Sequence, residues 1–133
     1  MTVDASTKHH DTALIYATWK DYPEIVKLLV SNGANVNQEN DKDGTPLWSA
    51  VKNNDVADVQ LLLDYGANPN PPGKSRWTML MQAADHGSLP IVDALLAHHA
   101  DKTATDNDGA TAYDLAVKHG HNDIAQVLAA TRA

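Results

Sequence analysis

A period of 33 residues governs this chain. A threonine recurs at that interval, at Thr12, Thr45, Thr78 and Thr111. Five positions after each threonine stands an alanine: Ala17, Ala50, Ala83 and Ala116. The same step is kept further on by Gly33, Gly66 and His99. Self-similarity at a fixed period of this size indicates stacked repeats, which together bury a core that no single unit could bury alone.

Each repeat is predicted to contain two short helices, and the small alanine on one side of the first helix should let a neighbouring helix approach closely. The threonine side-chain oxygen can cap the first helix. Pro46 suits the first turn of a helix, because a backbone amide there has no acceptor within the helix and its absence costs nothing. We expect the first helix to end after roughly two and a half turns, at a residue that adopts the left-handed conformation common at helix ends. The residues at that point are Asp21, Asn54, Gly87 and Gly120.

The second helix is indicated by apolar residues at helical spacing. In the first repeat these are Ile25, Val26, Leu28 and Leu29. Pro23 and Pro90 fall in the first turn of the second helix of their repeats, where proline does not interrupt a helix. A polar link rich in Asn, Asp, Gly and Pro then leads to the next repeat.

These features resemble the ankyrin repeat. The segments that carry the resemblance are Thr45-Pro46-Leu47, Gly120-His121 and the run from Leu62 to Asn70. It covers about residues 8–131. It implies an all-α solenoid of stacked helix-turn-helix units with projecting β-turn fingers, and no enzymatic activity. We expect a tail over residues 1–7 and a single domain over 8–133, with repeats at about 8–39, 40–72, 73–105 and 106–133.

The chain departs from the family pattern at several positions. The histidine that usually follows Thr-Pro-Leu is replaced in every repeat, by Ile15, Trp48, Met81 and Asp114. His99 stands where a glycine is expected, and some backbone strain is predicted there.

The resemblance also implies a binding face. In this family the late positions of the first helices and the fingers line a concave groove that binds partner proteins. The finger segments are residues 8–11, 39–44, 72–77 and 105–110. The predicted partner-binding residues are Trp19, Lys20, Lys42, Lys52, Asn53, Lys74, Arg76, Trp77, Asp85, His86, Lys118 and His119.

Charge and aromatic content favour this assignment. Basic and acidic side chains balance on the proposed face, so the formal net charge of -7 lies elsewhere on the chain. Trp77 and Arg76 are of the types in which binding energy concentrates, as is Trp19. The alternatives are that the charges are ordinary surface charges and that both tryptophans only pack on neighbouring repeats. Trp48, beneath a helix start, is expected to pack in the core.

Other classes of function have little support in the sequence. The acidic net charge argues against nucleic-acid binding, and no apolar run is long enough to span a bilayer. The chain has no cysteine, no glycine-rich phosphate loop and no serine in a strand-to-helix elbow. The first ten residues hold no apolar run of the kind a signal peptide needs. We therefore expect no catalysis, no cofactor and a cytoplasmic location.

The sequence therefore predicts a monomeric adaptor, scaffold or inhibitor that binds a partner protein. Two alternatives remain open. The chain has seven histidines, and His86 and His119 occupy equivalent positions in successive repeats, so with Asp85 or Asp108 they could bind a metal or a small molecule. The groove could also serve self-association.

Overall fold

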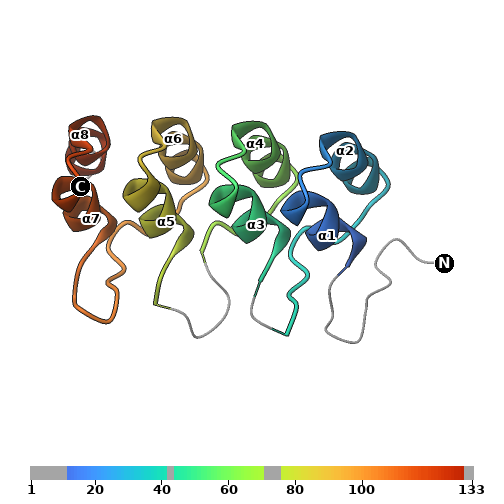
Figure 1. Cartoon of the computed structure of the whole chain (residues 1–133), viewed down its shortest axis with the longest axis horizontal. Coiled ribbons are helices and arrows are strands. Elements are labelled where there is room, and N and C mark those ends of the chain that lie inside the picture. Colours follow the sequence, from blue (N-terminus) through green and yellow to red (C-terminus); the bar gives the residue numbers. More distant parts are fainter. Residues whose placement is uncertain (1–11, 42–43, 71–75, 131–133) are drawn as a thin grey trace. The chain divides into compact units, whose positions relative to one another are not determined.

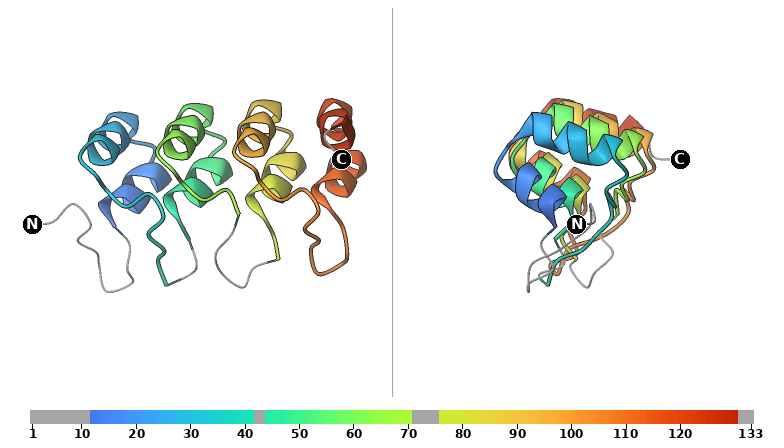
Figure 2. Two further views of the ribbon diagram at one scale, coloured as in Figure 1. Left: turned by 180° about the vertical axis from the view of Figure 1, so that it is seen from behind. Right: turned by 90° about the vertical axis from the view of Figure 1, so that its right-hand side faces the viewer.

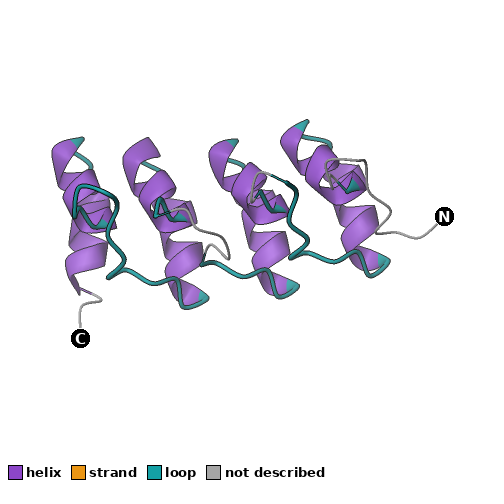
Figure 3. Cartoon of the chain, turned by 90° about the horizontal axis from the view of Figure 1, so that it is seen from below, coloured by secondary structure: helices purple, strands orange, loops and turns teal. Residues whose placement is uncertain are grey.

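Short helices in pairs make up the chain. The computed structural model describes residues 12–41, 44–70 and 76–130. Its internal contacts divide into a first unit, Met1–Asn68, and a second unit, Pro69–Ala133. The described residues form helices and connecting loops but no β-strand, which confirms the all-α class (Figure 3).

The first unit holds two helix pairs: α1 (Ala13–Trp19) with α2 (Pro23–Ser31), and α3 (Pro46–Lys52) with α4 (Val56–Asp64). Besides the packing within each pair, α1 packs on α3 and α2 packs on α4 (Figure 1). The first helices therefore form one layer of this unit and the second helices another.

The second unit repeats this arrangement with α5 (Met79–His86), α6 (Leu89–Ala97), α7 (Ala112–Lys118) and α8 (Asn122–Ala130). Here α5 packs on α7 and α6 on α8, again in two layers (Figure 2). The 33-residue period thus sets the layer that each helix joins.

The recurring threonines cap the first helices as predicted. Each side-chain oxygen accepts a hydrogen bond from the backbone amide three residues on, over 3.0–3.3 Å: at Ile15, Trp48, Met81 and Asp114. In the last repeat the Asp114 carboxylate also accepts from the Thr111 amide, over 3.0 Å. The caps need only a backbone amide at this position, so they persist although the family's histidine is absent.

The alanines and the helix ends also follow the prediction. All four repeated alanines are buried, and their small side chains let neighbouring helices approach closely. The first helices end at residues with positive φ, at 63° for Asp21 and 56° for Asn54. His99 has φ 70° and adopts the left-handed conformation that Gly33 and Gly66 take at the equivalent positions.

Side-chain hydrogen bonds hold the links in register. Asn37 Oδ1 accepts from the Asn68 amide, and Asn70 Oδ1, 33 residues later, accepts from the Asp101 amide, both over 2.7 Å. In one finger the Asp106 amide donates to the Ala110 carbonyl, and the Ala110 amide donates to Asp106 Oδ1. Each link is therefore fixed by an Asn or Asp that accepts backbone amide hydrogens.

The α2 helix leaves part of its apolar surface uncovered. Ile25 and Leu28 are 47% and 62% exposed, whereas Val26 is buried against the core of the first unit. The equivalent of Ile25 in the last repeat, Ile124, is fully buried where α8 packs on α6 and α7. Apolar residues at helical spacing are thus buried only where a neighbouring helix covers them.

The caps can be tested at Thr78, whose Oγ1 accepts from the Met81 amide over 3.0 Å. Thr78→Val keeps the shape but removes the acceptor, so the free energy of unfolding should fall by about 1 kcal/mol. Thr78→Ser keeps the acceptor, so its free energy of unfolding should fall clearly less than that of Thr78→Val. Urea denaturation followed by circular dichroism measures both values. Equal losses in the two variants would show that the hydroxyl does not cap α5.

Candidate partner-binding surface

An exposed aromatic and cationic cluster lies at the end of α1. Trp19 is 59% exposed and Tyr16 is 51% exposed. Their rings meet edge to face with centroids 6.1 Å apart. Lys20 Nζ lies 4.5 Å from the centroid of the Trp19 ring and 5.9 Å from that of Tyr16. These three residues, which we call the Trp19 cluster, combine a large apolar area with a positive charge held by cation–π attraction.

The end of α3 supports the backbone beneath this cluster. Asn53 Nδ2 donates to the carbonyl of Thr18 over 2.9 Å and to that of Trp19 over 3.1 Å. The Thr18 carbonyl also accepts from the Asp21 amide over 3.3 Å, so Asn53 adds a second partner there and gives the Trp19 carbonyl, at the last residue of α1, a partner from the next repeat. Asn53 therefore joins two repeats. The sequence predicted only a partner-binding role for this residue. Lys52, beside it, is exposed.

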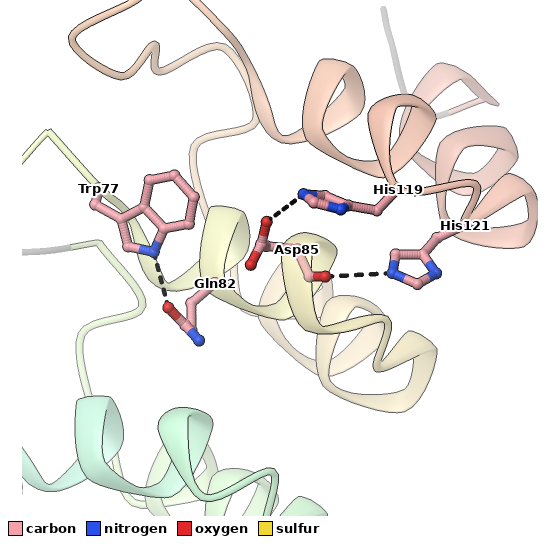
Figure 4. Close-up of polar contacts among 5 residues, drawn as sticks. All are labelled: Trp77, Gln82, Asp85, His119 and His121. Carbon is pink, nitrogen blue, oxygen red and sulfur yellow. Dashed lines mark hydrogen bonds and ion pairs between the residues drawn. The ribbon is translucent and has the colours of Figure 1, made fainter.

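Trp77 is held in a defined orientation at the start of α5. Its indole Nε1 donates to Gln82 Oε1 over 2.9 Å (Figure 4). The ring is half-buried, while Arg76 is exposed. Trp77 thus packs in part on its own repeat and keeps part of its surface accessible. Trp48, predicted to lie in the core, is also only half-buried.

Asp85 on α5 connects to two histidines that follow α7. Its Oδ1 lies 2.7 Å from His119 Nε2, and its backbone carbonyl lies 3.2 Å from His121 Nε2 (Figure 4). The two imidazoles stack with centroids 6.2 Å apart. The His121 ring also lies so close to Gly87 that a Cβ atom built there would be 2.7 Å from its Cε1. This polar network joins the two repeats of the second unit.

Two predicted site residues are exposed at helix ends, His86 on α5 and Lys118 on α7. Two more, Lys42 and Lys74, lie outside the described residues. Within the first unit, the structure brings together Trp19, Lys20 and Asn53. Within the second, it brings together Asp85 and His119.

An acidic cluster between the first two repeats was not predicted. One carboxylate oxygen from each of three residues, Asp21, Asp55 and Asp58, lies within 4.8 Å of the others. Asp21 is exposed after α1, Asp55 caps α4, and Asp58 is buried in the first turn of α4. The sequence did hold a signal, because Asp58 occupies the position taken by an isoleucine in the other repeats: Ile25, Ile91 and Ile124.

The protonation of this cluster is perturbed. Burial raises the pKa of Asp58 to about 6, and the charges of Asp55 and Asp21 act in the same direction. A hydrogen bond with Asp55 and its charge also raise the pKa of Asp21. Burial, the hydrogen bond and the nearby like charges all disfavour the ionised form of these carboxyl groups.

Together, paired helices of fixed period, capping threonines and links held by Asn and Asp define a helical repeat protein. The family model for ankyrin repeats (3 copies) matches residues 1–73 and 47–133. The chain belongs to the ankyrin-repeat family. Members of this family generally mediate protein–protein interactions and are typically non-catalytic. No curated protein matches the chain.

The packing of His121 on Gly87 predicts unequal effects of two glycine substitutions. Gly87 and Gly120 have φ of 92° and 73°, so alanine at either position should cost about 1 kcal/mol through the left-handed backbone. At Gly87 the new methyl group must also displace His121, whereas at Gly120 it meets nothing within 4 Å. Chemical denaturation should therefore show a larger loss for Gly87→Ala.

The excess loss in Gly87→Ala should shrink when His121→Ala is added, because the displaced ring is then gone. If the two glycine variants lose the same stability with His121 in place, the close packing of this ring is refuted.

The acidic cluster predicts an unusual pH dependence. The folded pKa of Asp58 lies above its ordinary value of 3.8, so the folded chain binds this proton more tightly than the unfolded chain does. The resulting stability is present below about pH 4 and is lost as the pH rises to about 6. Its size is at most about 3 kcal/mol, at about 1.4 kcal/mol per pKa unit. Asp58→Asn cannot ionise and should avoid that loss.

The measurement is the free energy of unfolding between pH 3.5 and 7.5 with EDTA present. The advantage of Asp58→Asn over the wild type should grow across this range and level off above pH 6.5. Asp93→Asn, an exposed change on α6, removes the same charge and serves as the control. A pH-independent difference between Asp58→Asn and the wild type would contradict the assignment.

Proposed function

We propose that this chain is a non-catalytic protein-binding module that acts as an adaptor, scaffold or inhibitor. Its partner contacts would come from the late residues of the first helices and from the fingers. Membership of the ankyrin-repeat family supports this general role. No described helix is long and apolar enough to cross a membrane. We further propose that the chain acts as a monomer in the cytoplasm, a reducing compartment compatible with a cysteine-free sequence.

The observation that carries this proposal is the Trp19 cluster. Trp19 and Tyr16 expose more than half of their surface, although both could bury it favourably against another protein. Tryptophan and tyrosine are among the residues that most often dominate binding energy. Lys20 lies over the Trp19 ring and adds a charge that can select an acidic group on the partner.

The second unit offers pre-organised side chains of the same kinds. The hydrogen bond to Gln82 limits the orientations of Trp77, and the contact with His119 limits those of Asp85. Side chains that are already ordered lose less conformational entropy on binding. Arg76, exposed beside Trp77, adds a planar cation suited to carboxylates.

The two alternatives are less well supported. Among the residues that the structure describes, no histidine belongs to a group of three ligands close enough to share a metal ion. His119 instead contacts Asp85. Self-association would make the apparent mass rise with concentration, which sedimentation velocity distinguishes from the proposed monomer.

A pair of tryptophan substitutions tests the proposal. Affinity enrichment from source cells identifies a partner, whose binary affinity is then measured with purified proteins. Combining Trp19→Ala with Trp77→Ala should weaken binding at least tenfold, because large anchor side chains are lost. Helical content should stay nearly unchanged, since Trp19 is exposed and Trp77 is half-buried.

The matched control is Tyr65→Ala, which removes an aromatic ring that is 54% exposed after α4 and outside the proposed surface. Its affinity should equal that of the wild type. If the double variant binds within twofold of the wild type, or if it unfolds while binding per folded molecule is kept, the tryptophans serve packing and the proposed surface is wrong.

A further inference from the structure

We propose that Asp21, Asp55 and Asp58 form a binding site for a hard divalent cation, with Ca²⁺ as the preferred ion. The site joins the first two repeats. Asp21 follows α1, whereas Asp55 and Asp58 lie at the start of α4. One oxygen from each carboxylate lies within 4.8 Å of the others.

The buried member of this cluster carries an oxygen that a cation could bind. Asp58 is only 3% exposed, and its Oδ2 is buried without a hydrogen-bond partner. A buried carboxylate oxygen without a partner is costly, so such groups are normally hydrogen-bonded, paired or bound to a metal. A cation between the three carboxylates would give this oxygen a partner.

Among the described residues, no cationic side chain offsets the charge of the cluster. No described Lys, Arg or His forms an ion pair with these carboxylates, whereas Asp85 has His119. The first amides of α4 help only in part, because the Asp58 amide donates to Asp55 Oδ1 over 3.1 Å. The three acids therefore repel one another at a place where a cation would attract all of them.

The ligand chemistry favours Ca²⁺. The three ligands are all carboxylate oxygens, which suit hard cations and not the softer metals that prefer histidine or cysteine. Ca²⁺ accepts oxygen ligands in flexible arrangements at about 2.4 Å, whereas Mg²⁺ at about 2.1 Å demands near-octahedral ligands. The three carboxylates come from the end of one helix and the start of another and lie within 4.8 Å of one another, which suits the more permissive ion.

Exposure of the cluster is graded in a way that suits entry of an ion. Asp21 is exposed, Asp55 is half-buried and Asp58 is buried, so an ion can approach from solvent and keep several waters. With only three protein ligands, we expect a dissociation constant of about 0.1–1 mM, as in weak Ca²⁺ sites.

Calcium binding to the whole chain tests this inference. Isothermal titration with CaCl₂ at pH 7.5 and constant ionic strength should show one site, and CaCl₂ should raise the thermal unfolding midpoint. Asp58→Asn should weaken Ca²⁺ binding at least tenfold and abolish the shift of the midpoint. Asp93→Asn removes the same charge from an exposed position on α6 and should bind Ca²⁺ like the wild type.

Three results would overturn the proposal. One is the absence of binding by the wild type below 10 mM CaCl₂. Another is an equal loss of affinity in Asp58→Asn and Asp93→Asn, which would mean general charge screening. A third is tighter binding of MgCl₂ than of CaCl₂, which would refute the choice of ion. No partner protein is needed, so failure here would leave the proposed function untouched.

Discussion

Every helix that the structure describes is too short to be stable alone, so the fold depends on the interactions that stabilise short helices. The described helices have seven to nine residues, whereas isolated helices shorter than about 12–15 residues are marginal in water. Each must therefore be held by caps at its ends and by packing on its neighbours. The threonine caps satisfy amides at the start of the first helices, and the buried alanines let those helices approach one another. The 33-residue period in the sequence reflects this need, because each repeat must place the same caps and packing residues at the same positions.

The same constraint explains why contacts between repeats involve helix ends. A short helix has a large share of unsatisfied backbone groups, and neighbouring repeats supply partners for them. Asn53 does so for the Trp19 carbonyl at the end of α1, and His121 does so for the Asp85 carbonyl at the end of α5. Exposed side chains on the first helices, such as Trp19, do not satisfy backbone groups in this way, which is why the proposed binding surface is built on them.

The sequence predicted the elements of the fold well, because they depend on local chemistry that repeats. The threonine caps, the buried alanines and the left-handed helix ends were all expected from single residues at fixed spacing. It predicted less of the side-chain network. Asn53 was assigned to a partner, yet its amide bonds to Trp19 and Thr18, because that geometry depends on how two helices meet. The contact between Asp85 and His119 arises in the same way.

The acidic cluster shows a different kind of gap. Asp58 breaks a position filled by isoleucine elsewhere, and comparison of the repeats at that position would have exposed it. Asp21 and Asp55 gave no such signal, since each suits its local role at a helix end. The two residues come together with Asp58 only because the first two repeats stack on each other. A cluster that we expect to weaken the fold at neutral pH is the kind of local conflict found at functional sites.

In the proposed mode of binding, the ends of the first helices contact a partner and the second helices serve only the stack. Hydrogen–deuterium exchange of the chain, free and bound to its partner, can distinguish these roles. We expect slower exchange around residues 16–20 and 52–53 in the complex, with the amides of α2 and α4 unchanged. Protection confined to α2 and α4 would contradict it.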